Sequence, residues 1–151
     1  MTTLNADTLR TFETQEDTNA LPVASKAKIF GGALVGRTED GYARPLQAGD
    51  AAVGFAKDAV DNTDGEDGDT TVEVKARGKV SLFVYGLGVA DVGKNVYASD
   101  DNTFTLTETD NSLVGKIVRF EKADYAIVAF DFLFTPETAS TTDNTQNDQG
   151  E

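Results

Sequence analysis

Apolar and polar residues alternate most clearly between Thr71 and Val84, and this alternation predicts a β-strand. One face of the segment carries Val72, Val74, Ala76, Val80, Leu82 and Val84. The other face carries Thr71, Glu73, Lys75, Arg77 and Lys79, so we expect a strand with one buried face. Gly78 interrupts the run, and a glycine inside so long a strand indicates a bulge or bend that divides it in two.

Two further runs lie near the C-terminus, at 114–120 and 125–134, and the charged segment 121–124 between them predicts a hairpin. Shorter strands are predicted at 27–30, 33–36, 42–46, 52–56, 95–98 and 103–106. No segment of the body has the 3.6-residue period of an amphipathic helix. We therefore expect an all-β fold with a small β-sandwich or barrel-like body.

The sequence resembles itself when it is shifted by 61 positions. The matching positions are Gly32 with Gly93, Val35 with Val96, Asp40-Gly41 with Asp101-Asn102, and Val53-Gly54 with Val114-Gly115. The copies span about 31–56 and 92–117, and they diverge where the first carries the insertion 58–69. Two interpretations stay open: an internal duplication of structure, or the recurrence of one hairpin pattern in a chain rich in Gly and Val.

The two ends of the chain differ from the body at 21–135. Residues 1–20 contain few large apolar side chains, which predicts an extended arm; a short helix capped by Asn5 or Asp7 is the alternative. Residues 136–151 contain neither a large apolar residue nor a base, so they cannot offset the entropy of ordering. We expect an acidic, disordered C-terminal tail.

Composition excludes several classes of function. The formal net charge is −13, which opposes direct binding of nucleic acid, since phosphate contacts require clustered Lys and Arg. The chain has no His and no Cys, so the usual general base and thiol nucleophile are missing and we expect no enzyme. No apolar run reaches the length of a membrane span, and the first ten residues lack a signal-peptide pattern, so we expect a soluble protein without a membrane partner.

The insertion 58–69 is the one candidate for a metal site, because its six carboxylates are ligands that calcium accepts. Their spacing does not match a calcium-binding loop, which needs alternating ligands, a closing Glu and flanking helices. We interpret the insertion as a solvated acidic loop and expect no metal and no cofactor.

Aromatic residues are concentrated near the ends of two predicted strands. Phe83 and Tyr85 follow Gly78, and the run 130–134 places three Phe on one face of its strand. Such surfaces belong either to the core or to a subunit interface, where aromatic residues are enriched. The candidate interface residues are Phe83, Tyr85, Phe132, Leu133 and Phe134.

Taken in order, the segments KAKIFGGALV, DAAVGFAKDAV, TTVEVKARGKVSLF, ADVGKNVYAS and SLVGKIV resemble the head decoration (cement) proteins of tailed bacteriophages. The resemblance covers roughly 21–131 and implies a structural virion protein, made in the host cytoplasm, on the outer surface of the capsid. It also implies a homotrimer that bridges copies of the major capsid protein through its N-terminal arm. The candidate capsid-binding residues of this chain are Leu4, Leu9, Phe12, Leu21 and Pro22.

Two other functions remain open at this point. One is a β-sandwich module that binds carbohydrate or another surface, which exposed aromatic side chains on one sheet face would favour. The other is a structural component of the phage tail or neck.

Overall fold

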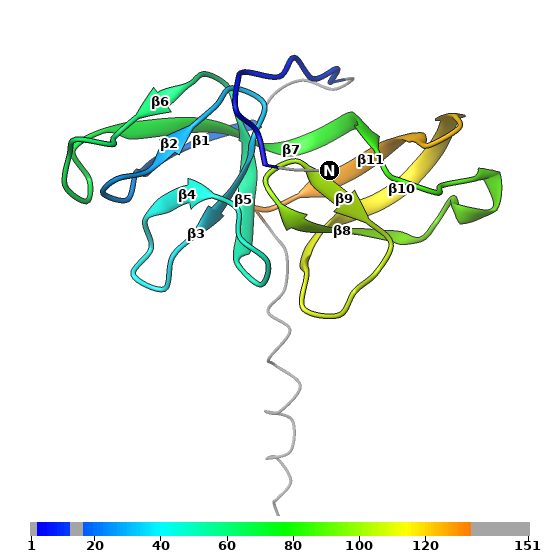
Figure 1. Ribbon diagram of the computed structural model, residues 1–151. Coiled ribbons are helices and arrows are strands. Elements are labelled where there is room, and N and C mark those ends of the chain that lie inside the picture. Colours follow the sequence, from blue (N-terminus) through cyan, green and yellow to red (C-terminus); the bar gives the residue numbers. More distant parts are fainter. Residues whose placement is uncertain (1–2, 13–16, 134–151) are drawn as a thin grey trace, which may run out of the picture.

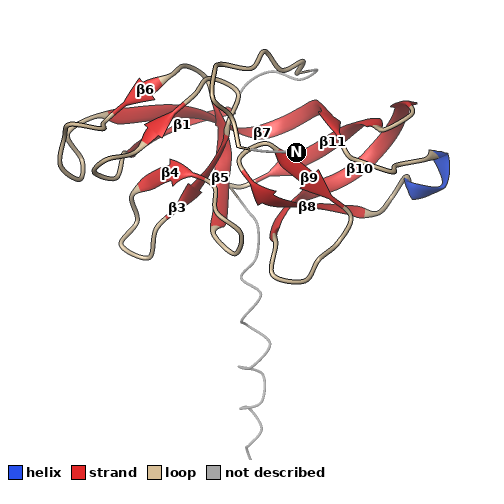
Figure 2. Ribbon diagram, in the orientation of Figure 1, coloured by secondary structure: helices blue, strands red, loops and turns tan. Residues whose placement is uncertain are grey.

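The computed structural model describes residues 3–12 and 17–133, and within them every regular element except one 3-10 turn is a β-strand (Figures 1 and 2). The strands are β1 Asp17–Pro22, β2 Lys28–Ile29, β3 Leu34–Arg37, β4 Ala43–Pro45, β5 Ala51–Ala56, β6 Val60–Asp61, β7 Thr71–Phe83, β8 Asn95–Asp100, β9 Thr103–Thr105, β10 Ser112–Lys122 and β11 Tyr125–Asp131. The turn, η1, covers Val89–Asp91. The fold is all-β, as predicted from the sequence. The predicted tail at 136–151 lies outside the described residues.

The strands form one curled antiparallel sheet with the order β4-β3-β5-β7-β11-β10-β8-β9, and β2 and β6 form a separate pair. The long strand β7 has two partners in succession, because β1 pairs with its first half and β11 with its second half. Arg77 marks the change of partner, and its guanidinium forms ion pairs with Asp17 at 2.9 Å and Asp131 at 3.4 Å. Gly78, with φ +153°, follows immediately.

The two halves of the sheet repeat each other residue for residue at the offset of 61 positions. Strands β3 and β5 pair at Leu34–Phe55, Val35–Gly54, Gly36–Ala52 and Arg37–Ala51. Strands β8 and β10 pair at Asn95–Lys116, Val96–Gly115, Tyr97–Leu113 and Ala98–Ser112. The register shift falls at the same place in both pairs. The predicted copies at about 31–56 and 92–117 therefore fold alike, with one register and one bulge.

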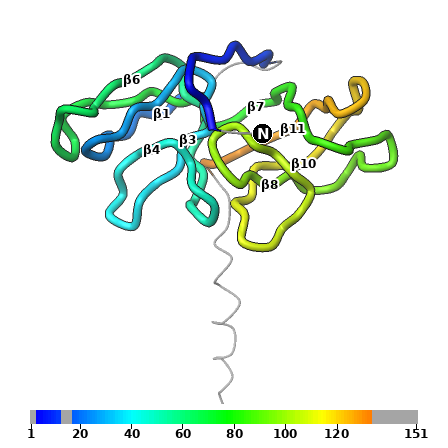
Figure 3. Tube along the Cα trace, viewed as in Figure 1, coloured from blue at the N-terminus to red at the C-terminus, as the bar shows by residue number. Residues whose placement is uncertain are grey.

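The structural copies extend beyond the segments found in the sequence. A parallel bridge joins Val23 to Ala43 in one half, and its equivalent joins Val84 to Phe104 in the other. Strand β7 therefore closes the first copy, 17–77, and opens the second copy, 78–131. Figure 3 shows the two copies as two lobes with β7 passing between them. The expectation that Gly78 divides this strand in two is wrong, because β7 runs unbroken through it. Gly78 stands instead at the boundary of the duplication.

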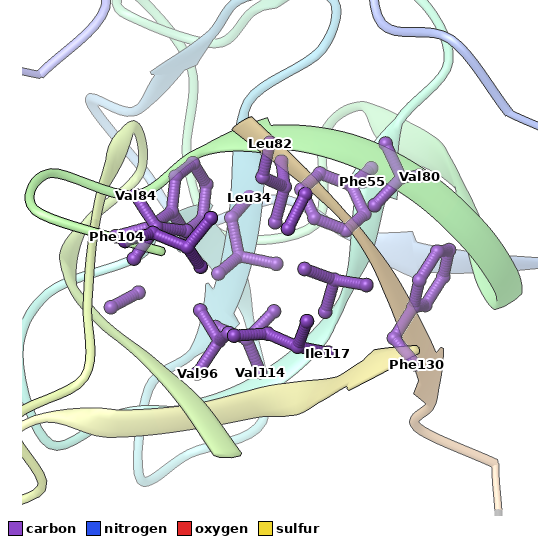
Figure 4. Packing of buried hydrophobic residues seen from close by; sticks show 14 of the residues in the cluster. Leu34, Phe55, Val80, Leu82, Val84, Val96, Phe104, Val114, Ile117 and Phe130 are labelled. Carbon is purple, nitrogen blue, oxygen red and sulfur yellow. The ribbon is translucent and has the colours of Figure 1, made fainter. Parts of the chain in front are cut away.

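Each copy surrounds its own apolar core. The first core comprises Val23, Ile29, Ala33, Val35, Ala43, Ala56, Val72 and Val74. The second core is larger and includes Val80, Leu82, Val84, Val96, Ala98, Phe104, Val114, Ile117, Ala126, Val128 and Phe130 (Figure 4). Strands β3 and β5 contribute to both cores, because their other faces supply Leu34 and Phe55 to the second. Both faces of these strands are buried, which explains why their sequences do not alternate.

The copies pack head to tail rather than symmetrically. The outer face of the first copy contributes Leu34, Leu46 and Phe55 to the second core, and all three are buried. The equivalent residues of the second copy, at the same offset, are Asn95, Thr107 and Lys116, which are exposed. One face is therefore a docking surface in the first copy and a solvent-facing surface in the second.

The insertion 58–69 lies on the surface of the first copy, and nine of its twelve residues are exposed, as expected of a solvated loop. Strand β6 pairs with β2, and Asn62 is buried, with its side-chain amide donating to the carbonyl oxygens of Val23, Ala24 and Glu66. Three of the carboxylates accept hydrogen bonds from nearby backbone amides, namely Asp61, Asp67 and Asp69. These acidic side chains therefore stabilise the conformation of the loop.

Asn62→Ala is expected to lower the free energy of unfolding by about 2 kcal/mol, because it removes three hydrogen bonds that the side-chain amide of this buried residue donates to the backbone. Chemical denaturation followed by circular dichroism measures the change. Asn111→Ala is the control, since Asn111 makes the same kind of amide-to-carbonyl bond on an exposed turn. Equal effects of the two substitutions would contradict a structural role for the insertion.

Candidate interaction surfaces

The N-terminal segment 3–12, here called the strap, is extended and lies across the seam between the two copies. The amide of Thr8 donates to the carbonyl oxygen of Gly31 at 2.7 Å, and the amide of Ser81 donates to that of Thr11 at 3.0 Å. At the start of the strap, the amide of Leu4 donates to the carboxylate of Asp101 at 3.0 Å. The helical alternative does not occur in 3–12.

Arg10 fastens the strap to both copies at once. Its Nε donates to the carbonyl oxygen of Gly32 at 2.8 Å, and its guanidinium donates to Oδ1 of Asn102 at 2.8 Å. The guanidinium carbon lies 5.7 Å from the ring centroid of Phe55 and 5.5 Å from that of Phe104. Burial lowers the pKa of Arg10 to about 10, which leaves the side chain charged at neutral pH and attracted to both rings.

Asp101 lies beneath the strap and is 2% exposed. Removal of its carboxylate from water raises its pKa to about 6, and the nearby charge of Asp100 acts in the same direction. The amide of Leu4 and the charge of Arg10 oppose this shift by stabilising the carboxylate. The seam therefore contains a carboxyl group that titrates just below neutral pH.

We expect Asp101 to make the protein less stable as pH rises from about 4 to 6. The pKa of this group is about 6 when folded and near 3.8 when unfolded, so the folded state binds the proton more tightly in this interval. The contribution is complete below the unfolded value and is lost above the folded one; we expect a change of about 3 kcal/mol. Denaturation at half-unit pH steps measures it, and Asp101→Asn should flatten the profile. An unchanged profile in this variant would contradict the assignment.

The structure separates the five candidate capsid-binding residues into two groups. Leu4 and Leu21 pack against the first core, and Phe12 packs against the second core, with its ring centroid 6.0 Å from that of Phe55. Pro22 is exposed at the end of β1, and Leu9 is 98% exposed. Only Leu9 and Pro22 are therefore positioned to contact a partner without first leaving the body.

The candidate interface residues are also divided between core and surface. The ring of Phe83 stacks edge-to-face on Tyr125 at 5.3 Å, and Phe132 packs against the second core. Tyr85 is 78% exposed and Leu133 is 41% exposed. Phe134 lies outside the described residues.

Sequence analysis missed a further apolar surface beside Tyr85. Val89, 65% exposed, and Val92 lie in the connection from β7 to β8 and, with Tyr85, form what we call the tip. The equivalent connection of the first copy contains β2, which β6 covers. The second copy has the tight turn between β10 and β11 where the first has its insertion, so the tip stays uncovered. In the sequence, the exposure of the tip is indicated only by the absence from the second copy of a segment equivalent to the insertion 58–69.

A scan against protein-family models and a search of curated proteins find no match to this chain.

Three other kinds of feature were sought in the described part of the chain: a metal site, an exposed aromatic surface and a membrane-spanning helix. No group of three or more Asp or Glu there is placed to hold a metal ion. Tyr85 is the one aromatic residue among the exposed large apolar side chains of the described residues. None of its helical segments has the length and apolar character needed to cross a membrane.

Proposed function

We propose that this chain is a structural virion protein that binds the outer surface of a phage capsid and cements contacts between major capsid subunits. The proposal begins from the resemblance of the body to head decoration proteins, which also implies a homotrimer. The observation that supports it best is the position of Leu9. A single exposed leucine is ordinary on a protein surface, but this one lies on a strap that is hydrogen-bonded on both sides of it, which suits it to contact a partner.

Leu9 is a pre-organised anchor because its neighbours fix the strap on both sides. The amide of Thr8 and the guanidinium of Arg10 are hydrogen-bonded to the body, and Phe12 forms a bridge with Val80. A partner that binds Leu9 therefore does not have to order the segment, which reduces the entropic cost of binding. Repetition of this contact around a shell adds weak contacts through avidity.

Co-sedimentation with mature heads, prepared without this protein from the phage that encodes it, tests the proposal. We expect saturable binding by the wild type and about a tenfold or greater loss of affinity in Leu9→Ser. This substitution leaves folding nearly unchanged because Leu9 contacts solvent. Deletion of 1–20 is a poor test, since it also removes the first four of the 6 residues of β1.

Tyr85→Ser serves as the comparison, because Tyr85 is a similarly exposed apolar side chain on the tip. Absence of saturable binding by the wild type would overturn the proposed function. Loss of binding in Tyr85→Ser with full binding in Leu9→Ser would assign the contact to the tip and overturn the role of the strap.

A further inference from the structure

We propose that the outer face of β8 and β10 is a docking surface for a second copy of this chain, which contacts it through the acidic insertion 58–69. We call this surface the second outer face. It comprises Asn95, Tyr97, Leu113, Lys116 and Val118. The inference goes beyond capsid binding and does not depend on it.

The internal duplication shows what this face does when it has a partner. In the first copy, the equivalents of Asn95, Leu113 and Lys116 are Leu34, Ala52 and Phe55, which pack into the second core. In the second copy Tyr97 pairs with Leu113 and Asn95 pairs with Lys116 in the same register. Leu113 and Val118 are each 42% exposed. The second outer face therefore keeps the shape of a docking surface and part of its apolar character, without an occupant.

The charge of the face indicates what binds to it. Lys116 stands where Phe55 stands in the first copy, and it is exposed. Lys94, just before β8, is already paired with Asp91 at 2.9 Å, so Lys116 is the cation that the face offers. A partly apolar face with an exposed lysine suits an acidic partner surface rather than a second apolar core. The insertion 58–69 is such a surface, because it contains six carboxylates and neither Lys nor Arg.

The carboxylates of the insertion have two different roles. Asp61, Asp67 and Asp69 are used within the loop, where they accept backbone hydrogen bonds. The others, Asp58, Asp64 and Glu66, are exposed, and their carboxylates have no such bond to the described part of the chain. These three are available to a partner.

The arrangement of the copies makes the contact intermolecular. Strand β6 and the insertion lie in one lobe, and β8 and β10 lie in the other (Figure 1). Within one chain, the insertion lies on the first copy, and the outer face of the first copy packs on the core of the second copy. A second chain placed against the second outer face thus continues the head-to-tail order that already exists within the chain. Such heterologous contacts form a ring if the rotation closes.

Sedimentation velocity over a range of concentrations at low salt tests this inference on the full chain. The net charge of −13 repels copies in general, so association requires the local pairing of opposite charges. We expect concentration-dependent association of the wild type, weakened about tenfold or more by Lys116→Glu and equally by Asp64→Lys with Glu66→Lys. Combining these three substitutions should restore association.

Matched controls change exposed charges away from both surfaces: Lys122→Glu for the cation and Glu39→Lys for the acid. A wild type that stays monomeric up to about 1 mM would overturn the inference. So would equal effects of Lys116→Glu and Lys122→Glu. Binding to heads is measured separately, so a monomer that still binds heads would overturn this inference and leave the proposed function standing.

Discussion

Phe55→Ala is expected to lower the free energy of unfolding by about 4 kcal/mol, whereas Lys116→Ala is expected to change it by less than about 0.5 kcal/mol. The two residues occupy equivalent positions of the duplication, on β5 and β10. Their backbones have the same register. The difference between the two changes in unfolding free energy therefore reports the contacts that each side chain makes.

Phe55 is fully buried where the copies and the strap meet. Its ring centroid lies 5.1 Å from that of Phe130, 6.0 Å from Phe12 and 6.4 Å from Phe104. Truncation removes this apolar contact and opens a cavity that the surrounding strands cannot fill by relaxing. It also removes one of the two rings beneath Arg10.

Chemical denaturation of both variants measures the difference. Phe55→Leu keeps most of the volume and should cost about 1.5 kcal/mol, which provides a folded variant if alanine prevents folding. Similar losses in Phe55→Ala and Lys116→Ala would contradict head-to-tail packing of the copies.

Gly32→Ala is expected to displace the strap and to cost about 3 kcal/mol, compared with about 1 kcal/mol for Gly93→Ala. Both glycines have positive φ, +87° and +96°, so backbone strain affects both substitutions alike. A Cβ atom at Gly32 would collide with the carbonyl oxygen of Thr8, whereas nothing lies within 4 Å of one at Gly93. The excess cost at Gly32 reports the contact between strap and body.

Hydrogen exchange of the Thr8 amide provides the second measurement of this pair. That amide donates to Gly31 in the strap's contact with the first copy, so Gly32→Ala should remove its protection and Gly93→Ala should not. Equal costs in the two variants, with Thr8 protected in both, would show that the strap is not held as described.

The elements with strong local patterns could be predicted from the sequence. The alternation from Thr71 to Val84 predicted β7, although the strand is not divided at Gly78 as expected and changes its pairing partner there instead. The offset of 61 positions located both copies, because turn glycines and the bulge at Val-Gly require particular residues at fixed spacing. Such features depend on the local backbone and are visible in a single sequence.

Features that depend on contacts between distant residues could not be predicted. The amide of Leu4 meets Asp101, 97 positions away, and nothing near Leu4 indicates that partner. The composition of the insertion indicated its exposure but not how it is anchored, because Asn62 resembles any turn residue in the sequence. Leu9 could be named as a candidate, but its exposure depends on how the rest of the strap docks.

The central claim, that the protein cements a capsid, is tested most directly by the rupture of filled heads on heating. Heads incubated with a saturating concentration of the wild-type protein should release their DNA at a higher temperature than heads without it, and the same concentration of the weakly binding variant Leu9→Ser should give a smaller increase. Release at the same temperature with every site on the head occupied would contradict the claim, since the protein would then bind the shell without stabilising it.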